Sequence, residues 1–96
     1  MPWPVHSLSL SAAGVAQRVS GTASQQDILL RFGQAVRARR GDLRLSQEEL
    51  AHLSGIDRSH MGKIERGERN VTLLNIERVA VALQTTPSKL LSEAGY

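Results

Sequence analysis

Residues 47–66, QEELAHLSGIDRSHMGKIER, carry the strongest structural signal in this chain of 96 residues. They predict two short helices joined by only three residues, Ser54-Gly55-Ile56, because Asp57 is suited to cap the start of the second helix. So short a link forces the two helices to cross sharply. Gly55 can adopt the positive φ that such a corner needs, and Ala51 is small where the helices approach each other.

The same stretch supplies an apolar inner side for this helix pair, formed by Leu50, Ile56, Met61 and Ile64. Four features agree with a helix-turn-helix over 46–66: the lengths of the two helices, the small Ala51, the glycine at the corner and the positions of the apolar residues. In this motif the second helix enters a major groove of DNA. An ordinary αα-hairpin within a helical bundle is the alternative reading.

The residues before this pair predict another helix, which begins near Asp27 and ends at Gly41-Asp42. Ser24 is a candidate cap for its start. Spacings of three and four place apolar side chains on one face of it: Leu29, Phe32 and Val36. The first helix of the pair is expected to start with a capping box formed by Ser46 and Glu49, and to run through Leu53.

Two more helices are predicted after the pair. Thr72 is placed to cap the first of them, whose apolar stripe consists of Leu73, Ile76, Val79, Ala80 and Leu83. Thr86-Pro87 opens the second, which carries Leu90 and Leu91. No segment reads convincingly as a strand, so the predicted fold is an all-α domain of five helices over residues 27–96.

Residues 1–26 have a different composition, rich in Ser, Ala and Gly and with Arg18 as their single charged residue. Such a stretch can bury little apolar surface, so we predict a flexible tail outside the domain. The net charge of +3, with ten Arg among the twelve basic residues, favours a nucleic-acid partner only weakly.

Several function classes are excluded or disfavoured by what the sequence lacks. Without cysteine there is no disulfide, thiol nucleophile or thiolate zinc site, and no apolar run is long enough to span a membrane. The three histidines are not spaced as metal ligands, and neither a carboxylate pair nor a nucleophile elbow is present. We therefore expect no enzyme activity, metal, cofactor or small-molecule ligand.

Three segments together resemble the phage-repressor type of helix-turn-helix, the XRE family: Leu45-Ser46-Gln47-Glu48-Glu49-Leu50-Ala51, Gly55-Ile56 and Ile64-Glu65-Arg66-Gly67. The resemblance covers about residues 28–92. Asp57-Arg58-Ser59 and Arg69-Asn70 are similar to controller proteins of restriction–modification systems. The resemblance implies a compact lambda-repressor-like domain that binds a palindromic operator in double-stranded DNA as a homodimer and regulates transcription in the cytoplasm.

Residues on the outer face of the second helix of the pair are candidates for contacts with bases. Arg58 and Ser59 lie in its first turn, and Lys63 projects from the same face. One arginine can donate to two acceptors of a guanine, which is worth about 1–3 kcal/mol of discrimination. The alternative for Arg58 is a solvated side chain paired with Asp57 or another surface acid. Gly62 either lets the backbone approach DNA or simply weakens the helix.

Phosphate contacts are expected from residues that flank this helix: Gln47, His60, Arg66, Arg69 and Asn70. The resemblance implies that Gln47 also braces the recognition helix. The backbone amides of the first turn are expected to add an anion site. For each residue alone, a solvated surface position is the alternative.

The resemblance gives a structural role to Glu65, as a buried carboxylate paired with Arg40. Arg37, Arg39 and Arg44 are interpreted as a solvated face that adds to the positive field. A dimer surface is expected among the apolar residues left over on the last two helices, such as Leu74, Val81 and Leu91.

The same fold could instead be an antitoxin-like or coactivator-like module that binds proteins. A module that binds only proteins would not need Arg58, Lys63, Arg66 and Arg69 on one surface, so we favour the DNA-binding regulator.

Overall fold

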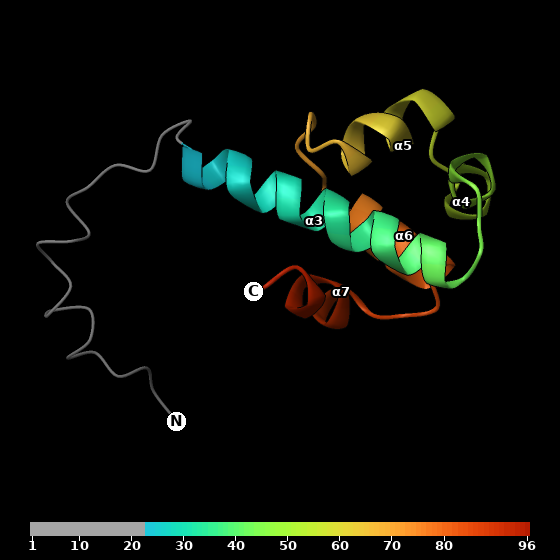
Figure 1. The fold of residues 1–96 in the computed structure, drawn as a ribbon. Helices are drawn as coiled ribbons and strands as arrows, with labels where there is room; N and C mark the ends of the chain where they lie inside the picture. Colours follow the sequence, from blue (N-terminus) through green and yellow to red (C-terminus); the bar gives the residue numbers. More distant parts are fainter. Residues whose placement is uncertain (1–22) are drawn as a thin grey trace, which may run out of the picture.

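The structure, a computed structural model, describes the backbone of residues 23–96 and the side chains of residues 27–96. This range contains five helices and no strand: α3 (Ala23–Asp42), α4 (Gln47–Ser54), α5 (Arg58–Glu65), α6 (Leu73–Ala82) and α7 (Pro87–Glu93). The long α3 runs through the middle of the fold, with α5 and α7 packed against it on different sides (Figure 1). The helix α4 packs against α5 and α6. The predicted all-α fold of five helices is confirmed.

The start of the first helix differs from the prediction. It begins at Ala23, so Ser24 lies inside α3 and is not its cap. Residues 23–26 contain no glycine or proline, which allows the helix to extend about one turn beyond Asp27 toward the N-terminus. The rest of the predicted tail, 1–22, falls outside the described residues.

The caps of the helix pair are those that the sequence predicts. The Ser46 hydroxyl accepts a hydrogen bond from the Glu49 amide at 3.0 Å, and the Ser46 amide donates to the Glu49 carboxylate at 2.8 Å. Gly55 ends α4 with a φ of 70°, in the left-handed region that favours glycine. The Asp57 carboxylate accepts from the Ser59 amide at 3.0 Å and caps α5. These local bonds fix both ends of the sharp corner.

The caps of the last two helices are also confirmed, since the Thr72 hydroxyl accepts from the Asn75 amide and the Thr86 hydroxyl accepts from the Lys89 amide. The predicted apolar stripe of α6 is wrong at one position: Leu73 is 84% exposed. It is the first residue of α6 and lies before the part of the helix that reaches the core, where Val79, Ala80 and Leu83 are buried.

The core contains apolar residues from all five described helices. Its largest fully buried side chains are Leu50, Met61, Ile64, Leu83, Leu90, Val36 and Val79. Each such side chain stabilises the fold by about 1.5–3 kcal/mol relative to an exposed position. The four apolar residues predicted for the inner side of the helix pair are all buried.

A backbone contact fixes the C-terminal end of α5 against α3. A Cβ atom on Gly33 would lie 2.5 Å from the carbonyl oxygen of Glu65 and 2.6 Å from that of Ile64. These distances are too short for any side chain, so only glycine permits α3 and α5 to approach this closely.

The interpretation of Arg39 as a solvated residue was wrong. Its Nε donates to the carbonyl oxygen of Leu83 at 2.9 Å, and its Nη2 donates to that of Gln84 at 3.0 Å. Arg39 therefore satisfies carbonyl groups at the C-terminal end of α6, a role that depends on a contact between distant parts of the chain. Arg37 and Arg44 are exposed, as expected.

Within residues 23–96, none of the helices combines the length and the apolar character required to cross a membrane.

Candidate nucleic-acid interface

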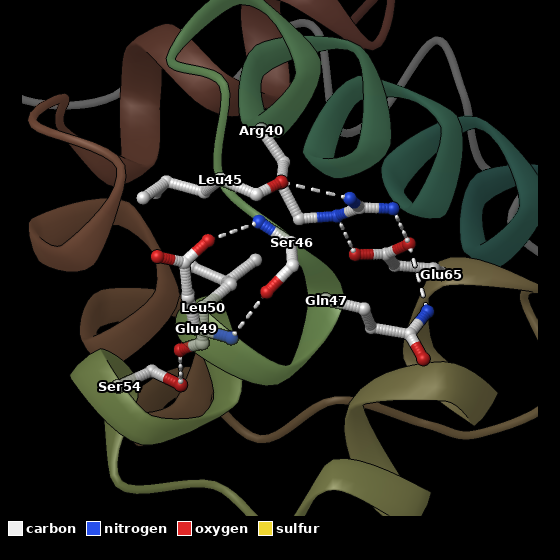
Figure 2. A network of polar contacts seen from close by, with 8 residues as sticks. All are labelled: Arg40, Leu45, Ser46, Gln47, Glu49, Leu50, Ser54 and Glu65. Atoms are coloured by element: carbon white, nitrogen blue, oxygen red, sulfur yellow. Dashed lines mark hydrogen bonds and ion pairs between the residues drawn. The ribbon is translucent and has the colours of Figure 1, made fainter.

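A buried ion pair links the helix pair to α3 (Figure 2). Arg40 Nε donates to Glu65 Oε2 at 2.7 Å, and Arg40 Nη2 donates to Glu65 Oε1 at 2.8 Å. The Glu65 side chain is 3% exposed and that of Arg40 is 17% exposed. The hydrogen bond with Glu65 raises the pKa of Arg40 above its ordinary value, although burial acts in the opposite direction. Arg40 and Glu65 thus form the structural pair that the resemblance implies.

Gln47 extends this pair into a network that joins three helices. Its amide nitrogen donates to Glu65 Oε1 at 3.1 Å, so the first residue of α4 is bonded to the last residue of α5 (Figure 2). Arg40 also donates to the carbonyl oxygen of Leu45, two residues before the start of α4. The network therefore sets the orientation of α5 relative to α3 and α4.

The outer face of α5 presents the three residues predicted to contact bases. Arg58 and Ser59 are exposed, and Lys63 is half-buried. The surface acid near Arg58 is Glu48 of α4, with Arg58 Nε 4.0 Å from Glu48 Oε2, whereas Asp57 caps the helix. Both members of this long ion pair are largely exposed, so Arg58 can turn toward a DNA base at little cost.

Gly62 is buried, which contradicts the idea that it opens the helix backbone to DNA. A Cβ atom at this position would lie 3.1 Å from Arg66 Nη1 and 3.3 Å from Gln47 Oε1. Two side chains of the protein itself cover the glycine. Its missing side chain therefore makes room for protein groups.

The residues predicted to contact phosphates fall into two groups. Arg66, Arg69 and Asn70 are exposed and lie between α5 and α6, where a loop can follow the DNA backbone. His60 differs, because its Nε2 atom is buried and has no hydrogen-bond partner among the described residues. This ring nitrogen does not face solvent in the way that the arginine side chains do.

The anion site expected from the first turn of α5 is partly occupied by the protein. The Asp57 carboxylate accepts from the amides of both Ser59 and His60. These two donors are satisfied within the chain, so the expectation that they serve a phosphate was wrong.

Glu68 is a residue of this surface that the sequence reasoning missed. Its carboxylate accepts from Arg66 Nε at 3.1 Å and from Arg66 Nη2 at 3.3 Å. The spacing of two residues in a loop gives no periodic signal, so only the loop geometry reveals this pair. Among the described residues, no group of three or more His, Asp or Glu side chains is placed to hold a metal ion.

The comparisons with known proteins agree with this geometry. A family model described as helix-turn-helix matches residues 36–90. Control protein C.SmaI of Serratia marcescens is 45% identical over 69 residues, which are 72% of this chain and 82% of that protein. Control protein C.BamHI of Bacillus amyloliquefaciens is 46% identical over 66 residues, or 68% of this chain and 82% of that protein.

A solved structure similar to this chain is also that of a controller protein. The restriction-modification controller protein C.AhdI from Aeromonas hydrophila is 53% identical in sequence, with a TM-score of 0.63 over 65% of this chain and 94% of its own. The resemblance inferred from the sequence is confirmed. The chain belongs to the helix-turn-helix family of the phage-repressor type, with restriction–modification controller proteins among its relatives.

Proposed function

We propose that the protein is a sequence-specific, DNA-binding regulator of transcription that binds a palindromic operator as a homodimer. The observation that carries this proposal is the two-sided character of α5. Met61, Ile64 and Glu65 anchor one side in the fold, while Arg58 and Ser59 are exposed on the other. A short, firmly anchored helix with exposed polar residues in its first turn is suited to a major groove.

Base reading and backbone binding are assigned to different residues. Arg58, Ser59 and Lys63 read base edges, with Arg58 suited to a guanine. Arg66, Arg69 and Asn70 hold phosphates on one flank of α5, and Gln47 does so from the start of α4. His60 joins these phosphate contacts by turning its ring outward, which exposes its buried Nε2 atom. Base contacts give specificity, and phosphate contacts fix the position of the protein on the duplex.

The proposed palindromic operator requires a homodimer, since two copies of α5 must enter successive major grooves about 34 Å apart. The controller protein C.Esp1396I, 26% identical with a TM-score of 0.63, has been solved as a tetramer in complex with its natural operator of 35 base pairs. We assign regulation of transcription to the present chain on its membership of the same family. We further propose that it has no enzyme activity and works in the cytoplasm.

Selection of bound sequences from a random pool of duplex DNA tests this proposal. We expect enrichment of an inverted repeat whose half-sites are about one helical turn apart, roughly 10 base pairs from centre to centre. Failure to enrich any sequence would overturn the proposal and favour the protein-binding alternative.

Two variants make the selection more specific. Arg58→Ala should relax the base preference at one position in each half-site, because it removes a base contact. Arg66→Ala should weaken binding to all sequences and reduce the salt dependence, because it removes a phosphate contact. If both variants enrich the same sequence as the wild type, the assignment of Arg58 is wrong.

A further inference from the structure

Arg66 is engaged in the absence of DNA. The two oxygens of the Glu68 carboxylate accept from two nitrogens of its guanidinium, at 3.1 and 3.3 Å. A guanidinium binds a phosphate through the same kind of paired hydrogen bonds. Glu68 thus satisfies Arg66 in the way that a phosphate group of DNA would.

The guanidinium of Arg66 also has a defined position on α5, over Gly62. Its Nη1 atom lies over Gly62, 3.1 Å from the point that a Cβ atom would occupy, and Gln47 Oε1 lies 3.3 Å from the same point. The side chain therefore lies back over α5, next to a second residue assigned to phosphate binding. Gln47 is itself fixed by its hydrogen bond to Glu65.

We propose that Glu68 competes with DNA for Arg66: its carboxylate occupies Nε and Nη2 of the guanidinium and is displaced when a DNA phosphate takes its place, while Nη1 stays over Gly62. This inference rests on the proposed function and adds that Glu68 opposes the binding of DNA of any base sequence. Glu68 lowers the affinity for every duplex by the same factor. It thereby raises the protein concentration at which DNA becomes occupied.

The size of the effect follows from the exposure of the pair. The side chains of Arg66 and Glu68 are 57% and 54% exposed, so their ion pair is screened by water. Replacing the carboxylate by an amide of the same shape should tighten DNA binding about 2- to 5-fold, the range that an exposed pair allows.

The test is a double-mutant cycle on DNA affinity. The variants are Glu68→Gln, Arg66→Ala and both together, and the probes are the selected duplex and a duplex of scrambled sequence. We expect Glu68→Gln to tighten binding of both duplexes about 2- to 5-fold in the wild-type background and to have no effect in the Arg66→Ala background. The melting temperature of Glu68→Gln should stay at the wild-type value.

Glu93→Gln is the matched control. It makes the same change in net charge on α7, which packs against α3 and α6, and should leave DNA affinity much closer to that of the wild type. The inference is overturned if Glu68→Gln brings no gain, if its gain persists without Arg66, or if Glu93→Gln brings an equal gain. Binding of the selected duplex by the wild type tests the proposed function separately.

The position of Arg66 over Gly62 is tested by Gly62→Ala. The added methyl group meets the ends of two side chains, at 3.1 Å from Arg66 Nη1 and 3.3 Å from Gln47 Oε1, so a shift of a few tenths of an ångström admits it and the variant should fold about as stably as the wild type. It should nevertheless bind both duplexes several-fold more weakly, because Arg66 is pushed from its position. Gly41→Ala, whose methyl group meets no atom within 4 Å, should keep wild-type affinity. Unchanged DNA affinity in Gly62→Ala would show that DNA binding does not depend on the position of Arg66 over Gly62.

Discussion

The carboxylate of Glu65 lies in the interior of the fold, where its negative charge requires hydrogen-bond donors. Arg40 donates twice to it and Gln47 once, so its two oxygens receive three hydrogen bonds. The fold tolerates such a buried charge only while these bonds are intact, because the interior offers no water to replace them. Glu65 is also the last residue of α5, the helix that carries the residues proposed to read bases, so the proposal makes stability and DNA recognition depend on the same residue.

Glu65→Ala should therefore be strongly destabilising. It leaves the guanidinium of Arg40 mostly buried without its carboxylate, and we expect a loss of about 3–5 kcal/mol in the free energy of unfolding. Urea denaturation followed by circular dichroism measures this. Asp27→Ala is the control, since it breaks the half-exposed pair with Arg31 and should cost about 1 kcal/mol or less. Equal losses in the two variants would contradict the importance of burial.

The Glu49 carboxylate makes the capping box of α4 sensitive to pH. Hydrogen bonding to Ser46, chiefly to its backbone amide, lowers the pKa of Glu49 from its ordinary value of 4.5. A carboxyl whose pKa is lower in the folded state stabilises the fold above its unfolded pKa, and this contribution is lost as the pH falls through the folded value.

Glu49→Gln should remove this part of the pH dependence, because an amide does not titrate. The melting temperature of the wild type should fall more steeply than that of the variant once the pH drops below about 4.5. Thermal unfolding of both proteins across this range checks the prediction. Parallel curves for the two proteins would show that the capping box does not contribute.

The helices themselves were largely predictable from sequence because their ends are set locally. Ser46, Asp57, Thr72 and Thr86 each act on amides two or three residues away, so the sequence contains all the information that their caps need. The misassigned residues depend on how the helices pack. Leu73 could not be recognised as exposed without knowing where α6 meets the core.

The junction between α3 and α5 leads to a prediction about two glycines of the same helix. Gly33→Ala should destabilise the fold by about 3 kcal/mol or more, because its methyl group meets backbone oxygens that cannot move aside. Gly41→Ala should instead stabilise it by up to about 1 kcal/mol, because alanine favours the helix and meets no neighbour. Chemical denaturation of both variants distinguishes the sites. Similar values would show that α3 can shift to accept the methyl group.

The candidate interface was predictable only in outline. The motif predicts which side of α5 faces outward, so Arg58, Ser59 and Lys63 could be chosen from their places along the helix. The bonds of Arg39 to α6 and of Arg66 to Glu68 depend on tertiary structure and loop geometry, which leave no pattern in the sequence. Gly62 shows this most clearly, since its role depends on two side chains that converge from different elements.

Assembly of the proposed dimer should depend on apolar residues that the folded chain leaves on its surface. Leu74 and Val81 on α6 are 54% and 67% exposed and lie two turns apart on one face. The double variant Leu74→Gln/Val81→Gln should keep its helical content yet sediment as a monomer. It should bind the operator roughly 100-fold more weakly, because the half-sites are no longer held together.

Leu53→Gln is the control for this prediction. Leu53 is 58% exposed but belongs to α4, so it is not part of the proposed contact surface on α6. This variant should remain a dimer in sedimentation. A dimer that persists in the α6 double variant would place the contact between protomers elsewhere.

The unequal burial of α5 has a consequence for how such regulators diverge. Its anchoring residues, Met61, Ile64 and Glu65, are buried, whereas Arg58 and Ser59 carry no part of the core. If Arg58 and Ser59 read bases as proposed, mutations at these two positions change the preferred DNA sequence with little penalty in folding. Duplicated copies of this gene could therefore acquire separate operators through a few substitutions, each intermediate remaining a stable protein.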